Sequence, residues 1–158
     1  MSLVRFQIID KPGVVTLYVT ALRKLHPPLI DTFALSFKST TNHVVFAGDT
    51  AFLPELAEFA KGADLLVNEA MLEDAIIPLV EWVGNGDDRL LKHLYALHTS
   101  TSDAAKIAAL SKVKILALNH LIPTDDLDFT MEHWRQAVEP NWKGQFFLGT
   151  DGKWIALN

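Results

Sequence analysis

The chain has 158 residues, of which 49% are hydrophobic, and a formal net charge of −5. This length suits one domain, and the hydrophobic content supplies a core and excludes a disordered chain. The absence of cysteine excludes disulfides, thiolate metal ligands and a cysteine nucleophile. No apolar run reaches the roughly 18 residues of a membrane span, and no signal-peptide pattern is visible, so we expect no membrane partner and favour a cytoplasmic location. Because the balance is acidic and lysines and arginines do not cluster, we expect no nucleic-acid partner.

The first third of the sequence predicts an antiparallel meander. The segments are rich in β-branched and aromatic residues, and Phe33, Leu35 and Phe37 alternate on one side of the third segment. The turn signal over 10–13 makes the first two segments a hairpin. Short connections allow only antiparallel neighbours. The predicted strands run over 4–9, 14–25, 31–39 and 43–47.

The remaining residues alternate between helical and strand patterns. Pro78 predicts a break in the helix that begins at Glu73, and Asp151-Gly152 favours a tight hairpin near the C-terminus. The fold class is therefore α/β (α+β) with a mixed sheet. The predicted helices cover 54–61, 73–83, 88–97, 104–110 and 130–138, and the predicted strands cover 64–67, 113–118, 144–148 and 153–157.

Two polar side chains follow buried strands at the point where each strand ends. Asp49 comes after the run Val44–Ala47, and His120 comes after Lys114–Leu118. Ligands of open α/β sheets bind at the carboxyl ends of the strands, so we expect the two residues to converge. A carboxylate and an imidazole are ligands for Zn²⁺, Mn²⁺ or Fe. The alternatives stay open, because an aspartate after glycine also forms turns and caps helices, and a histidine is often structural.

Three more residues are candidates on the same reasoning. Glu69 follows the strand 64–67. Its carboxylate either orients a nearby histidine or stabilises the positively polarised N-terminus of a following helix. His98 precedes Thr99-Ser100, which supplies a helix cap, and His98 is either a functional histidine or a hydrogen-bonding corner residue. His26 stands before two prolines in a loop, and it has either a loop role or a substrate-facing role.

Four short motifs follow one another in the chain: Gly48-Asp49-Thr50, Asn68-Glu69-Ala70, His98-Thr99-Ser100 and Asn119-His120-Leu121-Ile122-Pro123. Their order resembles the C-terminal half of a metallo-β-lactamase-fold hydrolase, and the resemblance extends from about Val14 to the C-terminus. The branch that these motifs resemble contains ribonuclease Z and arylsulfatase-like hydrolases. The family's first metal-binding signature, His-x-His-x-Asp-His, is absent.

The resemblance implies half of an αββα sandwich, with helices on one face of a mixed sheet, in a single partial domain over 1–158. It implies hydrolysis of an ester, sulfate or phosphodiester in a small-molecule substrate by water that two metal ions activate. Zinc is the expected metal, and manganese or iron are alternatives. Asp49 matches the bridging ligand and His120 a terminal ligand, while His98 and Glu69 match catalytic residues and His26 a substrate-facing residue.

Ligand number limits this interpretation. A catalytic zinc usually has three protein ligands, whereas the motifs supply only Asp49 and His120, so we expect the site to be incomplete and this chain to be inactive alone. The acidic charge also argues against the tRNA processing of ribonuclease Z. The alternative is a non-catalytic module that self-associates, as a homodimer, through the face of the missing half. Candidates for that face are Met71, Trp82 and the strand 14–25.

Overall fold

The structure, a computed structural model, describes residues 3–8, 17–83, 86–124 and 128–157. Its described residues form one seven-stranded sheet, in which the strands follow one another in chain order, and five helices. The strands are β1 (Leu3–Ile8), β2 (Leu17–Arg23), β3 (Phe33–Lys38), β4 (His43–Phe46), β5 (Leu65–Met71), β6 (Ile115–Ile122) and β7 (Gln145–Leu148). The helices are α1 (Glu55–Phe59), α2 (Glu73–Val83), α3 (Arg89–Leu97), α4 (Thr101–Ser111) and α5 (Met131–Val138).

The sheet changes from antiparallel to parallel pairing at β4. The strands β1 to β4 pair antiparallel, which confirms the predicted meander. From β4 to β7 every pair is parallel, because a helical connection separates the strands and returns the chain to the same end of the sheet. The α/β class with a mixed sheet is therefore confirmed. The predicted residues 9 and 14–16 of the first hairpin lie outside the described residues.

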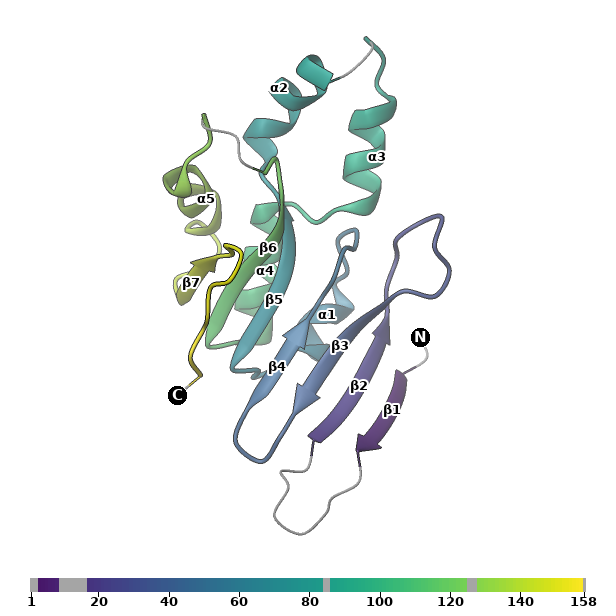
Figure 1. The fold of residues 1–158 in the computed structure, drawn as a ribbon, viewed down its shortest axis with the longest axis vertical. Helices are drawn as coiled ribbons and strands as arrows, with labels where there is room; N and C mark the ends of the chain where they lie inside the picture. Colours follow the sequence, from purple (N-terminus) through teal and green to yellow (C-terminus); the bar gives the residue numbers. More distant parts are fainter. Residues whose placement is uncertain (1–2, 9–16, 84–85, 125–127, 158) are drawn as a thin grey trace.

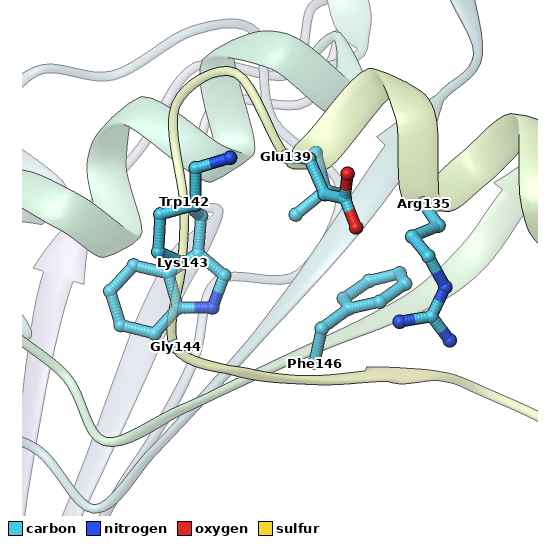
Figure 2. Close-up of a pocket in the computed structure, with 7 residues that line it drawn as sticks. Arg135, Glu139, Trp142, Lys143, Gly144 and Phe146 are labelled. Atoms are coloured by element: carbon cyan, nitrogen blue, oxygen red, sulfur yellow. The ribbon is translucent and has the colours of Figure 1, made fainter.

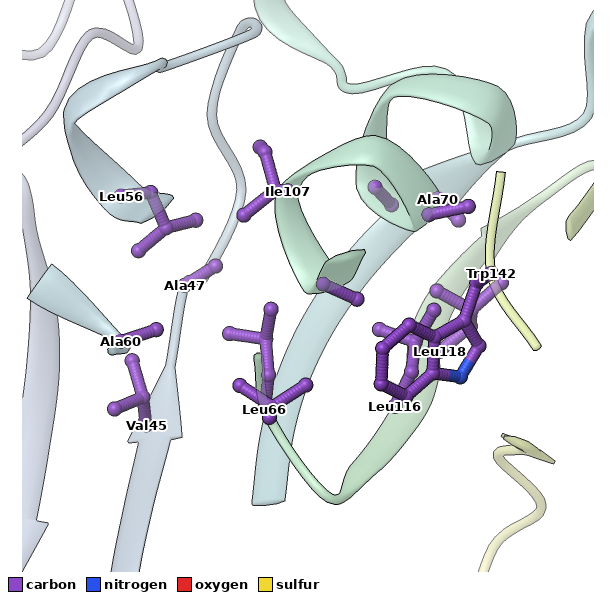
Figure 3. Packing of buried hydrophobic residues seen from close by; sticks show 14 of the residues in the cluster. Val45, Ala47, Leu56, Ala60, Leu66, Ala70, Ile107, Leu116, Leu118 and Trp142 are labelled. Carbon is purple, nitrogen blue, oxygen red and sulfur yellow. The ribbon is translucent and has the colours of Figure 1, made fainter. Parts of the chain in front are cut away.

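One face of the sheet carries the main core. Val45, Leu66 and Leu116 occupy equivalent positions on β4, β5 and β6, and all three are fully buried. They pack against Leu56 of α1 and Ile107 of α4 (Figure 3). Both helices lie behind the sheet in the view of Figure 1. Because side chains at alternate positions of a strand point to the same face, each of these strands directs one apolar side to the helices.

The opposite side of β3 and β4 carries an exposed apolar surface, which we call the open face. Leu35 and Phe46 pair across β3 and β4, yet Leu35 is 37% and Phe46 45% exposed. The rings of Phe37 and Phe46 contact edge to face, with centroids 5.8 Å apart. The predicted alternation of Phe33, Leu35 and Phe37 thus belongs to this face, while Ala34 is the buried neighbour on the core side.

The C-terminal segment packs over β5 and β6 on the side of the sheet that carries the open face. Its position corrects one prediction. Residues 153–157 are not a strand, so the predicted hairpin with β7 is wrong. Ile155 and Leu157 instead pack against Leu65, Ile115 and Ala117 of β5 and β6. Both side chains are partly buried in this contact, which removes apolar surface of β5 and β6 from water.

Two further predictions, the helix break at Pro78 and the placement of Met71 on an open surface, are also corrected. The helix α2 is continuous, although Pro78 lies inside it. Asp74, whose carbonyl loses its helical partner to the proline, is exposed, so water can satisfy it. Met71 is fully buried and Trp82, 85% exposed, lies on α2. Neither residue lies on β3 or β4, which carry the open face, whereas Val19 of β2 pairs with Phe37 of that face.

Candidate functional site

The candidate residues meet at the carboxyl edge of the sheet. Strands β4, β5 and β6 are parallel, so Asp49, Glu69 and His120 reach the same end. Strand β2 runs in the direction of β4, because both pair antiparallel with β3, and this brings His26 to that end as well. His98 follows α3. The segment after His98 is held beside the end of β5 by a hydrogen bond from the Met71 amide to the Thr99 carbonyl.

Asp49 and His120 form a pair at the outer side of this edge. The Oδ2 atom of Asp49 lies 3.7 Å from Nε2 of His120, and both side chains are partly exposed. The turn before Asp49 requires a glycine, because Gly48 has a φ of 62° and a Cβ there would lie 2.8 Å from the Lys24 Nζ atom. The predicted convergence of these two side chains is therefore present in the fold.

A β-bulge presents His120. Glu69 of β5 pairs with Asn119 of β6, but Ala70 pairs with Leu121, so His120 is an extra residue without a partner in this ladder. Its φ of 43° is the left-handed conformation that such a bulge residue adopts. Leu121 thereby returns to the helix side and packs against the main core. The bulge directs His120 out of the regular alternation.

Glu69 is a fully buried acceptor that connects three segments. Its Oε1 atom accepts hydrogen bonds from the backbone amides of Thr50 (3.2 Å) and Thr99 (2.8 Å), and its Oε2 atom lies 3.2 Å from His98 Nδ1. Burial raises the pKa of Glu69 to about 8, although the amides of Thr99 and Thr50 oppose this rise. Burial therefore favours the protonated form of this carboxyl group.

His98 stands between two other histidines. Its ring stacks on that of His120 at a centroid distance of 5.7 Å and meets the ring of His26 edge to face at 5.8 Å. Burial, followed by the proximity of His120, lowers the pKa of His98. The buried Nδ1 atom of His26 has no hydrogen-bond partner among the described residues. The structure thus brings all five predicted residues together at one edge.

Several residues of this edge were not predicted from sequence. The Thr99 hydroxyl donates to the Thr50 carbonyl (2.7 Å), and the Thr101 hydroxyl donates to the Met71 carbonyl (3.0 Å). Threonines in loops and at helix starts have many roles, so no sequence signal distinguishes these two. Lys24 is buried beneath the Asp49 turn. The sequence could have indicated this burial, because Lys24 is two residues after the inward-facing Leu22 and so points to the same side.

The residues present match zinc in type but not in number. A carboxylate oxygen and an imidazole nitrogen are common zinc ligands, and Asp49 and His120 supply one of each. Within the described ranges, however, no three His, Cys, Asp or Glu side chains are grouped so that they could hold a metal ion. These residues alone therefore do not complete a catalytic metal site.

Two cavities lie outside this group of residues. One, of about 290 Å³, adjoins the start of β7, at the opposite edge of the sheet; Figure 2 shows Arg135 and Phe146 on one side of it and Trp142 on the other. The second, of about 420 Å³, lies between Leu121 and Leu148. Neither of these two cavities is lined by the five candidate residues.

Comparison with solved structures identifies the class of fold. The metallo-β-lactamase-fold protein YhfI from Bacillus subtilis superposes with a TM-score of 0.66 and 19% identity over 94% of this chain and 51% of its own. The short form of human tRNase Z gives a TM-score of 0.58 and 21% identity over 98% of this chain and 46% of its own. The chain therefore has the metallo-β-lactamase fold and corresponds to about half of these structures.

Sequence comparison shows which enzymes the chain is similar to. The chain is similar to ribonuclease Z, with 29% identity to the enzyme of Mycobacterium marinum and 27% to that of Mycobacterium tuberculosis H37Rv, each over 126 residues. The matches cover 80% of this chain but only 42% and 43% of the relatives, so the chain spans about two-fifths of their length. No protein-family model matches the chain. The resemblance inferred from the four motifs is confirmed.

The prediction that nucleic acid is not a partner was wrong. The similar proteins are ribonuclease Z and tRNase Z, whose names state an RNA substrate. The error came from the net charge of −5, which averages over the whole surface and does not describe any single site. As for membranes, none of the helices in the described ranges has the length and apolar character needed to cross one.

Proposed function

We propose that this chain supplies the C-terminal half of a metal-dependent hydrolase site that cleaves phosphodiesters. The observation that carries the proposal is the convergence of Asp49, Glu69, His98 and His120 at one edge of a metallo-β-lactamase fold. The partial domain over 1–158 contributes these residues, and the other residues of the site come from outside the described ranges.

In this proposal Asp49 and His120 are metal ligands. Their separation of 3.7 Å brings an oxygen and a nitrogen donor to the same point at the exposed edge. Two bound divalent ions, with zinc favoured over manganese and iron, would lower the pKa of a water molecule and polarise the phosphoryl group. Since two ligands hold zinc weakly, the chain alone should bind metal poorly and have little activity.

His98 and Glu69 act as a neutral pair. Because burial favours the protonated carboxyl group and the uncharged imidazole, Glu69 Oε2 donates its proton in a hydrogen bond to His98 Nδ1. The remaining ring hydrogen is then on Nε2, which can donate a hydrogen bond to a developing negative charge. Transfer of this hydrogen to a leaving group would be balanced by transfer of the Glu69 proton to Nδ1, which leaves His98 neutral and Glu69 ionised. His26, whose ring contacts His98, lies where it can face the substrate.

The experiment that tests the proposal is the substitution His98→Ala in the hydrolytically active protein that contains this chain. We expect turnover of bis(p-nitrophenyl) phosphate and of RNA to fall about 10²- to 10⁴-fold, the range for loss of a general acid or base. Metal content, measured by elemental mass spectrometry, should stay constant. His93→Ala, at an exposed position of α3, is the control and should retain activity. Loss of metal in His98→Ala would instead make His98 a ligand.

A second candidate function is a non-catalytic module that associates through the open face. The supporting observation is the exposure of Leu35 and Phe46 on adjacent strands, together with the contact between Phe37 and Phe46. Apolar side chains exposed together on one sheet face are typical of an interaction surface.

Phe46→Lys should abolish this association, because a charge in the centre of an apolar interface is costly to desolvate. In sedimentation-velocity measurements we expect the wild type to sediment as a larger species and Phe46→Lys as a single chain. Tyr95→Lys, which replaces an exposed aromatic residue of α3, should behave as the wild type. A wild type that sediments as a single chain at all concentrations contradicts this candidate.

A further inference from the structure

The cavity between α5 and β7 lies at the opposite edge of the sheet from the candidate site, and the proposed reaction gives it no role. Its lining comes from α5, from the segment that follows this helix and from the start of β7. Its volume is about 290 Å³, whereas a water molecule takes up about 30 Å³ in the liquid. The cavity therefore has room for a small organic molecule.

Two aromatic side chains form walls of this cavity. Figure 2 shows Trp142 on one side of it and Phe146 on the other. Phe146 is fixed by the sheet, because it pairs with Leu116 of β6. The amide of Trp142 donates to the Val138 carbonyl (3.0 Å), and its indole Nε1 donates to the Gln145 carbonyl (3.4 Å). Both walls are thus held in place before a ligand binds, which lowers the entropic cost of binding.

Gly144 makes room for the indole of Trp142. A Cβ atom at position 144 would lie 2.1 Å from the Cζ2 atom of Trp142, so any other residue there would displace the ring. The glycine is part of the cavity lining as well. The chain therefore has the residue type that this aromatic wall requires.

Three charged side chains complete the lining. Arg135 and Lys143 are exposed and carry positive charge, and Glu139 is exposed and carries a carboxylate. The Nε atom of Arg135 lies 3.8 Å from Oε2 of Glu132. In the part of the chain that the structure describes, neither Lys143 nor Glu139 has an ion-pair partner. Opposite charges that line one cavity without pairing are available to complementary groups of one ligand.

These features together match a nucleotide. The flat face of a base stacks on aromatic side chains, and a phosphate group binds arginine and lysine. A carboxylate can only accept hydrogen bonds, so Glu139 favours a base whose edge presents donors. Guanine presents N1–H and its N2 amino group side by side, which suits two carboxylate oxygens. Adenine and cytosine instead have an acceptor nitrogen next to their amino group.

We propose that the cavity between α5 and β7 binds a guanine nucleotide. The base lies between Trp142 and Phe146 and donates to the Glu139 carboxylate. The phosphate lies at Arg135 and Lys143. The nucleotide is either free in solution or part of an RNA strand. The inference stands independently of the proposed hydrolysis, because none of these residues belongs to the candidate site.

The test is isothermal titration calorimetry of the chain with GMP and with AMP at pH 7, with a chelator present to exclude metal-dependent binding. We expect GMP to bind with a Kd below about 1 mM and AMP to bind roughly tenfold more weakly. Glu139→Gln should weaken GMP binding about tenfold and leave AMP binding unchanged, because the amide offers one acceptor and one donor. Arg135→Gln should weaken the binding of both nucleotides, because both carry the phosphate.

Arg89→Gln is the matched control, since Arg89 is an exposed arginine of α3, and it should bind GMP as the wild type does. NMR spectra locate the ligand, because GMP should shift the indole N–H signal of Trp142 and leave that of the exposed Trp154 in place. Competition by the hexamer UUGUUU would identify an RNA strand as the source, and its absence a free nucleotide. Absence of GMP binding at about 10 mM, or binding that Glu139→Gln and Arg135→Gln both retain, would overturn the proposal.

Discussion

Replacing Asp49 with Asn should abolish the hydrolytic activity of the protein that contains this chain, with a loss of at least about 10³-fold. Asparagine preserves the size and polarity of the side chain, but its neutral amide is a poor ligand for zinc and cannot bridge two metal ions as a carboxylate does. Among the described residues, Glu69 cannot replace Asp49 as a ligand, because Glu69 is buried and occupied by the amides of Thr50 and Thr99.

The measurement is turnover of a phosphodiester together with metal content, for the wild type and for Asp49→Asn. Asp151→Asn is the matched control, because Asp151 is an exposed aspartate that follows β7 at the same edge of the sheet. It should retain both activity and metal. Normal turnover in Asp49→Asn would show that the pair Asp49 and His120 is a surface contact without a metal-binding role.

Glu69→Ala should destabilise the fold by about 3–5 kcal/mol, which is a large part of the stability of a typical domain. The substitution leaves two buried amides without an acceptor, and each such loss costs about 1–3 kcal/mol. It also leaves a cavity in a region without exposed surface. Because Glu69 connects β5 with the segments after β4 and α3, the damage should extend to Asp49 and His98.

Glu69→Gln separates these effects. Its amide oxygen can still accept from Thr50 and Thr99, and its NH₂ group can donate to His98 as the protonated carboxyl does. We therefore expect its loss of stability to be less than half that of Glu69→Ala. Urea unfolding at pH 7 provides both values. Equal losses in the two variants would mean that Glu69 contributes by its volume and that the hydrogen bonds are secondary.

Much of the fold could be predicted because local patterns agree with the final packing. The alternation in β3 and the helical signals around α4 and α5 gave the correct elements. The strands β5 and β6 were predicted too short, because their polar ends, with Asn68 and Asn119, look like the start of a loop. In the structure the two strands pair with each other as far as Met71 and Ile122. A single sequence does not reveal this pairing.

The site was predicted in part. The order of four motifs located Asp49, Glu69, His98 and His120, and the structure brings these residues together. Lys24 was missed, because a lysine in a strand normally faces water and only its phase with Leu22 distinguished it. The position of the C-terminal segment was also predicted wrongly. Whether such a segment pairs as an edge strand or packs on the sheet depends on which surface of the sheet is left uncovered, and the sequence does not show this.

Because of the bulge in β6, the side chain at position 120 does not take part in the packing of its neighbours. Residues of a buried strand are constrained by the core on one side and by their ladder partners on both flanks, whereas His120 lies outside the ladder and outside the core clusters. Selection can therefore change the side chain at this position while Leu118 and Leu121 keep the core intact. An edge built in this way allows one scaffold to exchange the side chain that it presents at this position while the core stays unchanged.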